Sequence, residues 1–186
     1  MISVIVLIIA VLAAFSIIYF TFKNGISPMP SSKKVCAEIA KLVSEEKVVH
    51  ELGSGFGHLA FAIAKANLNC KVIAYENSFI PFFYTYLVSH MLRLKNIKVI
   101  LGDFWKLDFS QFECVVAYQY IEGVQRLYLK MESETNNGLK FITNTFSVHK
   151  TKCNKKVYIN DISNSVLFCY KVEPRLKSGK LHEEII

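Results

Sequence analysis

His50-Glu51-Leu52-Gly53-Ser54-Gly55-Phe56-Gly57-His58-Leu59 is the stretch of sequence that decides the fold. The apolar run over 47–52 predicts a short buried strand before the glycines, and the apolar residues over 59–64 predict a helix after them. Glycines suit such a turn because the backbone must bend sharply and let a ligand lie against it. A strand, a glycine turn and a helix N-terminus are typical of the first unit of a nucleotide-binding α/β fold.

The spacing of these glycines distinguishes between cofactors. A dinucleotide fingerprint, G-x-G-x-x-G, would place its third glycine at position 58, which is a histidine. The chain instead has an acid followed by alternating glycines, at Glu51, Gly53, Gly55 and Gly57. This variant resembles motif I of the class I S-adenosylmethionine-dependent methyltransferases, whose glycine turn passes under the methionine part of the cofactor. The resemblance implies that Glu51 faces the amino end of that cofactor.

Acidic residues also lie at the carboxyl ends of the next two predicted strands, over 71–76 and 98–101. The first of these strands ends at Glu76, about 20 residues past the glycine turn, where nucleotide-binding folds hold a ribose. A carboxylate there can accept hydrogen bonds from both ribose hydroxyls. Asp103 follows the other strand, and resemblance to the methyltransferases implies that it bonds the adenine amino group while Phe104 packs beside the ring.

The N-terminus carries an apolar run over 2–22 that only serine and threonine interrupt. Because about 20 helical residues span a bilayer core, this run is long enough to cross a membrane. A cleavable signal peptide would have a basic residue ahead of a shorter apolar core, and a buried core helix would keep a polar face. Neither description suits the run, so we expect a single-pass transmembrane anchor.

The flanks of this run predict its orientation and the organisation of the chain. Lys23, Lys33 and Lys34 follow the run, and no charged side chain precedes it. The positive-inside rule then places the following domain on the cytoplasmic side, or on the matrix side in an organelle. The predicted organisation is a transmembrane anchor over 1–23, a linker over 24–32 and one methyltransferase domain over 33–186.

Strands and helices alternate along the rest of the chain. This order predicts an α/β fold, namely a Rossmann-like class I methyltransferase sheet, mostly parallel, with a closing antiparallel hairpin, behind the transmembrane helix. The predicted helix over 79–93 is rich in aromatic rings, which we expect to lie in the core. Two other helices are predicted, over 33–46 with Ser31 or Ser32 as its cap and over 124–133. Further strands are predicted over 113–118 and 139–146. A basic loop over 150–156 then leads to the two strands of the hairpin, over 157–161 and 165–172, which are joined near Asn164.

Composition narrows the class of partner and the compartment. The formal net charge is +7, but the basic residues are spread out and no recognition domain is appended, so we expect no nucleic-acid partner. No cysteine or histidine cluster has the spacing of a zinc site, so we expect no metal. Four of the five cysteines lie in apolar stretches (Cys36, Cys70, Cys114 and Cys169), which predicts buried thiols in a reducing compartment rather than a disulfide framework.

One resemblance is closer than the superfamily. The chain resembles the family of the membrane-anchored ATP synthase c-subunit lysine methyltransferase and its bacterial relatives in four segments. These are the apolar N-terminal run, the segment Pro30-Ser31-Ser32-Lys33-Lys34, the E-L-G-S-G-x-G motif, and the segment G-D-F-W-K-L-D-F-S over 102–110. The resemblance covers most of the chain from about Pro28 to Phe146. It implies S-adenosyl-L-methionine as the cofactor, with contacts at Glu51, Gly53, Gly55, Gly57, Glu76 and Asp103. Ser54, Asn77 and Phe104 adjoin these residues and are further candidates for cofactor binding.

Two departures from the family concern the site. The family often has an acid where this chain has Phe56, and a Gly-x-Pro element after the fourth strand is replaced by Gln119-Tyr120-Ile121. That second region shapes the acceptor site. Tyr118 and Tyr120 lie there and are the candidate catalytic residues, because they can line a pocket and orient an acceptor amine.

The resulting functional hypothesis is a membrane-anchored S-adenosylmethionine-dependent methyltransferase whose favoured acceptor is a protein lysine amine near the membrane. Methyl transfer from a sulfonium is an in-line displacement that needs positioning more than covalent catalysis. A lysine, with an ordinary pKa near 10.4, must first lose a proton, and a desolvated pocket lowers that cost. The alternatives are methylation of a lipid, quinone or other small molecule, and a non-catalytic methyltransferase-like module for assembly at the membrane.

Overall fold

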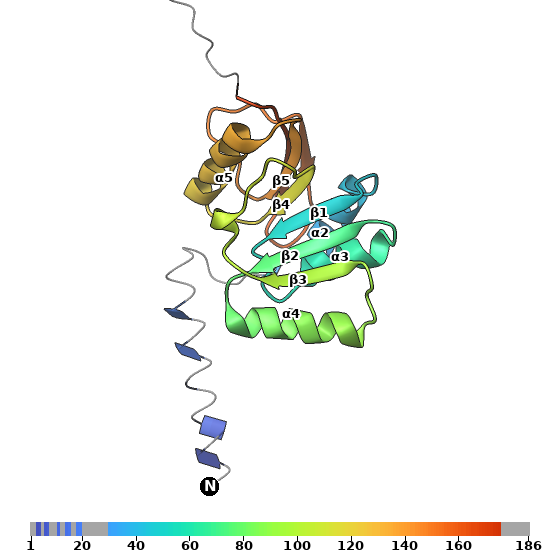
Figure 1. Cartoon of the computed structure of the whole chain (residues 1–186), viewed down its shortest axis with the longest axis vertical. Helices are drawn as coiled ribbons and strands as arrows, with labels where there is room; N and C mark the ends of the chain where they lie inside the picture. Colours follow the sequence, from blue (N-terminus) through green and yellow to red (C-terminus); the bar gives the residue numbers. More distant parts are fainter. Residues whose placement is uncertain are drawn as a thin grey trace, which may run out of the picture.

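A computed structural model describes residues 30–175 together with residues 3–4, 6–7, 11, 14–15 and 18–19. Within this part of the chain the strands form one sheet (Figure 1). Their bounds are β1 Val48–Leu52, β2 Lys71–Glu76, β3 Ile97–Leu101, β4 Cys114–Ala117, β5 Leu139–Asn144, β6 Lys155–Tyr158 and β7 Val166–Val172. The strand order is β3-β2-β1-β4-β5-β7-β6.

The pairing of the strands confirms the predicted sheet. β1 is parallel to both β2 and β4, and the outer pairs β2–β3 and β4–β5 are also parallel. β7 is antiparallel to both β5 and β6, which makes the closing hairpin. Parallel strands covered on both faces are nearly continuous apolar runs, and all four residues of β4 are buried.

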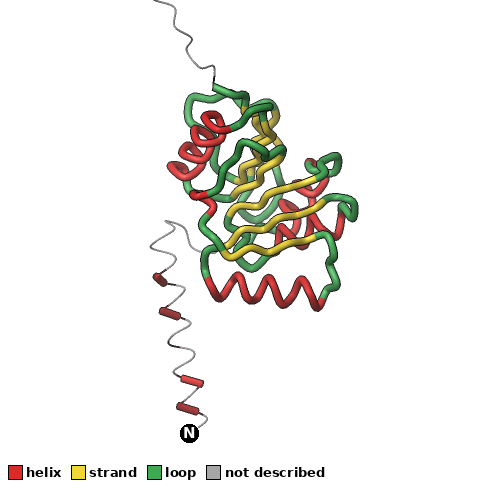
Figure 2. The backbone as a smooth tube through the Cα atoms, viewed as in Figure 1, coloured by secondary structure: helices red, strands yellow, loops and turns green. Residues whose placement is uncertain are grey.

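Helices cover the two faces of the sheet and its β3 edge. They are α2 Lys33–Leu42, α3 His58–Ala66, α4 Phe79–Met91 and α5 Ile121–Glu134, with a short 3-10 helix, η1, over Phe104–Lys106. α2 and α3 pack together on one face, where Ile39 and Ile63 meet Val72. α5 covers the opposite face, where Leu127 and Met131 meet strand residues including Phe141. Figure 2 shows α4 lying along β3, at the edge of the sheet.

The ends of several elements differ from the prediction for local reasons. α5 begins at Ile121 rather than near Val124, because Tyr120 already has the extended backbone of an N-cap. β5 ends at Asn144, before the predicted end at Phe146, because Thr145 has a φ of 70° and leaves the strand. Lys155 and Lys156 lie in β6 rather than in the predicted basic loop.

The prediction that the aromatic rings of α4 lie in the core is wrong. Phe79, Phe83, Tyr84 and Tyr86 are between 46% and 62% exposed. The buried positions of the helix are instead Pro81, Thr85 and Ser89. A helix at the edge of a sheet buries only a narrow strip against β3 and β2, and small side chains let its backbone approach closely.

The start of α2 is tied to the loop of the hairpin. The Ser32 hydroxyl accepts a hydrogen bond from the Val35 N–H at 3.2 Å, as an N-cap does, and donates one to Asp161 Oδ2 at 2.6 Å. The Lys34 ammonium donates to the carbonyl of Asn160 in the same loop. The hydrogen bond from Ser32, followed by that from the Ser165 N–H, lowers the pKa of the Asp161 carboxyl to about 2.

The structure confirms the predicted state of the cysteines. Cys36, Cys70, Cys114 and Cys169 are buried, and all the cysteines of the chain are free thiols. The pKa of Cys36 is raised to about 11, mainly because the thiol is buried. This thiol therefore stays protonated and unreactive near neutral pH. These side chains behave as small hydrophobic residues of the core.

The predicted transmembrane anchor, 1–23, and the linker lie for the most part outside the described residues. Among the residues that the structure describes, no helix is long and apolar enough to cross a membrane. The anchor therefore stays a prediction that rests on the sequence.

Candidate functional site

The glycine turn joins the carboxyl end of β1 to the start of α3. Gly53, Gly55 and Gly57 have φ values of +78°, +53° and +75°, a left-handed conformation that side chains disfavour. The N–H groups of Gly53 and Ser54 both donate to the carbonyl oxygen of Tyr75 at 2.9 Å, which fixes the turn against the end of β2. The turn predicted from the sequence is therefore present, and its backbone conformation explains why glycines occupy it.

The surroundings of the three glycines differ. A Cβ atom added at Gly57 would lie 2.6 Å from Thr85 Cγ2, and one at Gly53 would lie 3.1 Å from Gln119 Nε2. A Cβ at Gly55 would meet no heavy atom of the described residues within 4 Å. The protein itself packs against two of the glycines, whereas Gly55 faces open space in which a ligand can lie against the backbone.

Glu76, at the end of β2, holds this turn in place. Its Oε2 accepts a hydrogen bond from the Gly55 N–H at 2.7 Å, and its Oε1 accepts one from the Ser78 N–H at 2.8 Å. The side chain is only 6% exposed. Each carboxylate oxygen has two lone pairs, so capacity remains to accept hydrogen bonds from a ligand. Ribose binding by Glu76 stays a prediction, and the structure adds a second task, which is to brace the glycine turn.

Two buried polar atoms next to the turn lack hydrogen-bond partners. Within the described part of the chain, Glu51 Oε2 and Ser54 Oγ are the buried side-chain oxygen or nitrogen atoms without one. Buried polar groups are almost always satisfied, so such atoms beside an open glycine are those that a polar ligand would satisfy. Both belong to the set of residues predicted to bind the cofactor.

The environment of Glu51 disfavours its ionised form. Burial is the main cause that raises the pKa of its carboxyl to about 8, and the charge of Glu76 adds to it. The backbone N–H of Ala60, in the first turn of α3, acts in the opposite direction. A cation placed beside Glu51 would restore the ionised form, and an ammonium group is a ligand of that kind.

Asp103 and Phe104 follow β3 and have different surroundings. Asp103 caps η1, because its Oδ1 accepts a hydrogen bond from the Trp105 N–H at 3.0 Å. Phe104 is only 6% exposed, and its ring lies 3.8 Å from the position of a Cβ on Gly53, beside the glycine turn. Packing of Phe104 beside an adenine ring stays a prediction, and the burial leaves little of the ring for that contact. Asn77 is half-buried next to Glu76, where its Oδ1 accepts a hydrogen bond from the Ser78 hydroxyl at 3.2 Å.

The carboxyl end of β4 forms the other side of the candidate site. From β1 the chain adds β2 and β3 on one side, and it then returns to place β4 on the other side of β1. Ligands of open α/β sheets bind at such a point, outside the carboxyl ends of the strands. The half-buried Tyr118 ring stacks with Phe146 at 6.4 Å between centroids, and Tyr120 occupies the N-cap position of α5. A Cβ at Gly123 would lie 3.1 Å from the Tyr120 ring, so α5 approaches this tyrosine closely. The two tyrosines therefore border the same strand end but pack against different elements.

Two residues of the site were not predicted from the sequence. Gln119 is 6% exposed and lies against Gly53, and its position at a strand end between two tyrosines was the available signal. Thr85 is fully buried, and its hydroxyl donates to the Gly55 carbonyl at 2.9 Å. No pattern in the sequence indicates that contact, because it arises from the packing of α4 against the turn.

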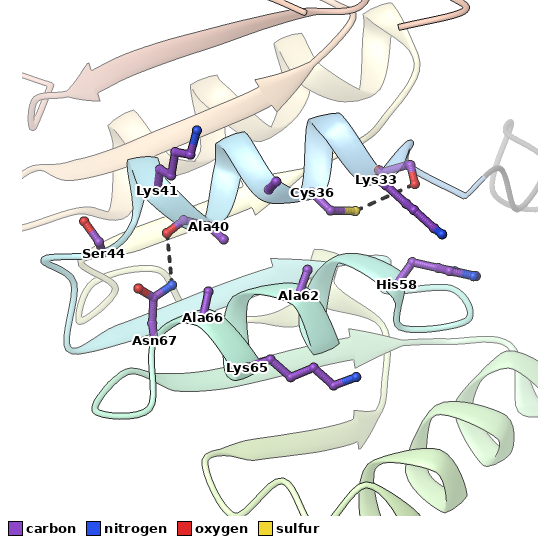
Figure 3. A pocket seen from close by; sticks show the side chains of 12 residues that line it. Lys33, Cys36, Ala40, Lys41, Ser44, His58, Ala62, Lys65, Ala66 and Asn67 are labelled. Carbon is purple, nitrogen blue, oxygen red and sulfur yellow. Dashed lines mark hydrogen bonds between the residues drawn. The ribbon is translucent and has the colours of Figure 1, made fainter.

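A groove lies between α2 and α3 (Figure 3). Alanine side chains line it between the two helices, and the Asn67 amide bridges them by donating to the Ala40 carbonyl at 2.9 Å. Among the described residues, none of the buried polar atoms that lack partners lies in this groove. The same part of the chain contains no group of three or more metal-ligating side chains. The carboxyl edge of the sheet is therefore the candidate site.

Comparisons with known proteins agree with this geometry. A family model described as the ANTKMT methyltransferase domain matches residues 51–155. The lysine N-methyltransferase of the ATP synthase c-subunit from Rattus norvegicus is 24% identical over 120 residues, covering 63% of this chain and 55% of the relative. The Mus musculus protein of the same name is 26% identical over 130 residues, covering 63% and 52%. The chain thus spans about half the length of these relatives.

The fold itself matches a solved structure. An RNA methyltransferase from Salinibacter ruber, in complex with S-adenosyl-L-homocysteine, superimposes with a TM-score of 0.70 and covers 81% of this chain and 97% of its own. The two sequences are 17% identical, so this likeness concerns the fold.

Proposed function

The chain belongs to the ANTKMT methyltransferase domain family, a family of class I S-adenosylmethionine-dependent methyltransferases, and from this premise we propose that it methylates a lysine side chain of a protein held at a membrane. The observation that carries the proposal is the extent of the family match. It covers 51–155, which includes the glycine turn, the acids at the carboxyl ends of β2 and β3, and both tyrosines of the acceptor side. Two relatives that the chain resembles are named as lysine methyltransferases of the ATP synthase c-subunit.

The residues of the glycine turn suit the cofactor of this family. Glu51 offers a buried carboxylate oxygen to an amino group, and Ser54 offers a hydroxyl that lacks a partner among the described residues. Gly55 leaves the backbone open, and Glu76 retains lone pairs for hydroxyl groups. S-adenosylmethionine, when bound, supplies a methyl group on a positively charged sulfur.

The acceptor side has to present a neutral amine in line with the methyl group. We assign Tyr118 and Tyr120 to the walls of the acceptor pocket, on the strength of their half-buried positions at the carboxyl end of β4. A pocket that removes water disfavours the ammonium form of a lysine and so lowers the cost of losing its proton. The remaining contribution is positioning, which a rigid strand end beside the buried Gln119 can provide.

The apolar run over 2–22 is the proposed anchor, with the catalytic domain on the cytoplasmic or matrix side. Support for this part of the proposal comes from the length of the run and from the lysines that follow it. An anchor confines the search for an acceptor to a surface, which raises the effective concentration of membrane proteins around the site.

A labelling experiment tests the acceptor. Membranes from a strain that lacks the protein are incubated with the purified full-length chain and S-adenosylmethionine labelled in its methyl group, and protein and lipid extracts are counted separately. We expect label in protein, released as methyllysine on hydrolysis, and none with the Glu76→Ala variant. Label confined to the lipid extract would rule out the lysine acceptor and favour a small amphiphile. Absence of label together with intact cofactor binding would favour a non-catalytic membrane module.

A further inference from the structure

α4 directs its apolar side chains away from the protein. Phe83, Leu87 and Met91 follow one another at helical spacing along its outer face and are 62%, 60% and 72% exposed. Tyr84 and Tyr86 flank this row at 48% and 46%. A surface helix of a globular protein normally has the opposite arrangement, with the apolar stripe inward and the polar residues outward. We call these five residues the outer face of α4.

The charged residues of the segment that carries this outer face have one sign. Residues 77–102 include α4 and β3 and contain no aspartate or glutamate. Arg93 and Lys95 follow the end of the helix, Lys98 lies in β3, and all three are exposed. An apolar, aromatic surface in a segment whose only formal charges are cations is complementary to a surface that is apolar inside and anionic outside, as a bilayer with acidic lipids is.

Other occupants of the outer face are less well supported. Among the described residues, none of the other helices packs over it, since α4 contacts β2 and β3. A protein partner would be expected to meet the cations with acidic groups, whereas the two tyrosines suit the interface between lipid and water.

We propose that the outer face of α4 inserts into the interfacial layer of an anionic bilayer, with Arg93, Lys95 and Lys98 at the lipid phosphates. An amphipathic helix can lie in this layer with its apolar side in the acyl boundary. Each basic residue near an anionic surface adds to the attraction. The contact depends on no residue of the predicted anchor.

This contact places the candidate site beside the membrane. The Thr85 hydroxyl on the inner side of α4 holds the Gly55 carbonyl, and the Tyr84 ring meets the Phe56 ring edge-on with centroids 5.4 Å apart. Phe56, one of the two departures from the family noted in the sequence, thus extends the aromatic surface of α4 to the glycine turn. The inference rests on the proposed function only where it explains access to an acceptor held in the bilayer.

Fluorescence quenching by brominated lipids tests the contact in the full-length protein. The chain has one native tryptophan, Trp105, so Phe83→Trp adds a single reporter whose emission is obtained by subtracting that of the parent. Leu129→Trp, at 50% exposure, is the matched control on α5, a helix that packs against β5 and β7 instead of β2 and β3. Both variants are reconstituted in vesicles of phosphatidylcholine and phosphatidylglycerol, with and without bromine on the acyl chains.

We expect strong quenching of the added emission at position 83 and none at position 129. Quenching at position 83 should weaken when phosphatidylglycerol is omitted or when Arg93, Lys95 and Lys98 are changed to glutamine. Equal quenching at both positions would overturn the proposal. So would an unquenched reporter at position 83 in protein that floats with the vesicles, the result expected if a second copy covers the face.

Calorimetry with S-adenosylmethionine on the same variants in detergent separates the two proposals, because cofactor binding is expected to be unchanged. If the parent protein does not bind S-adenosylmethionine, the proposed function is refuted, but the proposed lipid contact is not.

Discussion

Replacing Glu51 by glutamine should remove a pH dependence of stability that the parent protein has. Burial raises the pKa of the Glu51 carboxyl in the folded state from an ordinary value of 4.5 to about 8. The folded protein therefore keeps a proton that the unfolded chain loses, and its free energy of unfolding falls as the pH rises from 4.5 to about 8. At about 1.4 kcal/mol per pH unit, the loss across this window has an upper limit of about 5 kcal/mol. Since small domains are stable by about 5–15 kcal/mol, a loss of this size is large.

The assay is urea unfolding of the full-length chain in a mild detergent, followed by circular dichroism at about pH 5 and about pH 9. Glu51→Gln keeps the shape of the side chain but cannot ionise, so we expect it to gain stability relative to the parent as the pH rises. Glu113→Gln, at an exposed position, is the control and should follow the parent. The reasoning is refuted if Glu51→Gln and the parent differ by the same free energy at both pH values.

Three further substitutions test the packing around the site. Gly57→Ala should lower the melting temperature strongly, since a left-handed alanine costs roughly 1–2 kcal/mol and its Cβ would also lie 2.6 Å from Thr85 Cγ2. Asp161→Asn should lower the free energy of unfolding near neutral pH but not below about pH 2, because the carboxyl that Ser32 and Ser165 stabilise is ionised only above that value. Phe56→Ala should cost about 1 kcal/mol of stability, the usual contribution of an edge-on aromatic pair, and leave the affinity for S-adenosylmethionine intact, as calorimetry would show.

Each of these substitutions has a matched control or a contrary outcome. Gly55→Ala has the same backbone strain without a clash, so it should destabilise less than Gly57→Ala and impair cofactor binding more. Asp108→Asn changes another carboxyl whose pKa is lowered by hydrogen bonds from Ser110; hydrogen exchange should show a loosened α2 in Asp161→Asn but not in this control, because Ser32 of the α2 cap donates to Asp161. A large loss of cofactor affinity in Phe56→Ala would assign that ring to the cofactor pocket instead of to α4.

The sequence predicts the sheet and much of the site because local chemistry fixes both. An acid with three alternating glycines after an apolar strand leaves few possible backbones, and the structure has all three glycines in the left-handed region. Glu76 and Asp103 lie near the same sheet edge because parallel strands bring their carboxyl ends together. This constraint comes from topology and needs no detailed packing.

The features that the sequence did not predict depend on packing between elements. α4 is apolar over most of its length, so periodicity could not indicate which face is buried, and the inward residues proved to be Pro81, Thr85 and Ser89. The hydrogen bond from Thr85 to Gly55 and the contact of Gln119 with Gly53 arise only once α4 and β4 are placed against the turn. The burial of Phe104 has the same origin, because η1 folds back beside Gly53.

Calorimetric titration of S-adenosylmethionine into the purified full-length protein tests the central claim most directly. We predict one saturable site whose heat of binding varies with the ionisation enthalpy of the buffer. Burial raises the pKa of Glu51 to about 8, so this carboxyl is protonated at neutral pH. It releases its proton to the buffer when an ammonium group binds beside it. The Glu51→Gln variant should bind more weakly and release no proton. Absence of saturable binding by the parent protein would contradict the assignment of the glycine turn as the cofactor site.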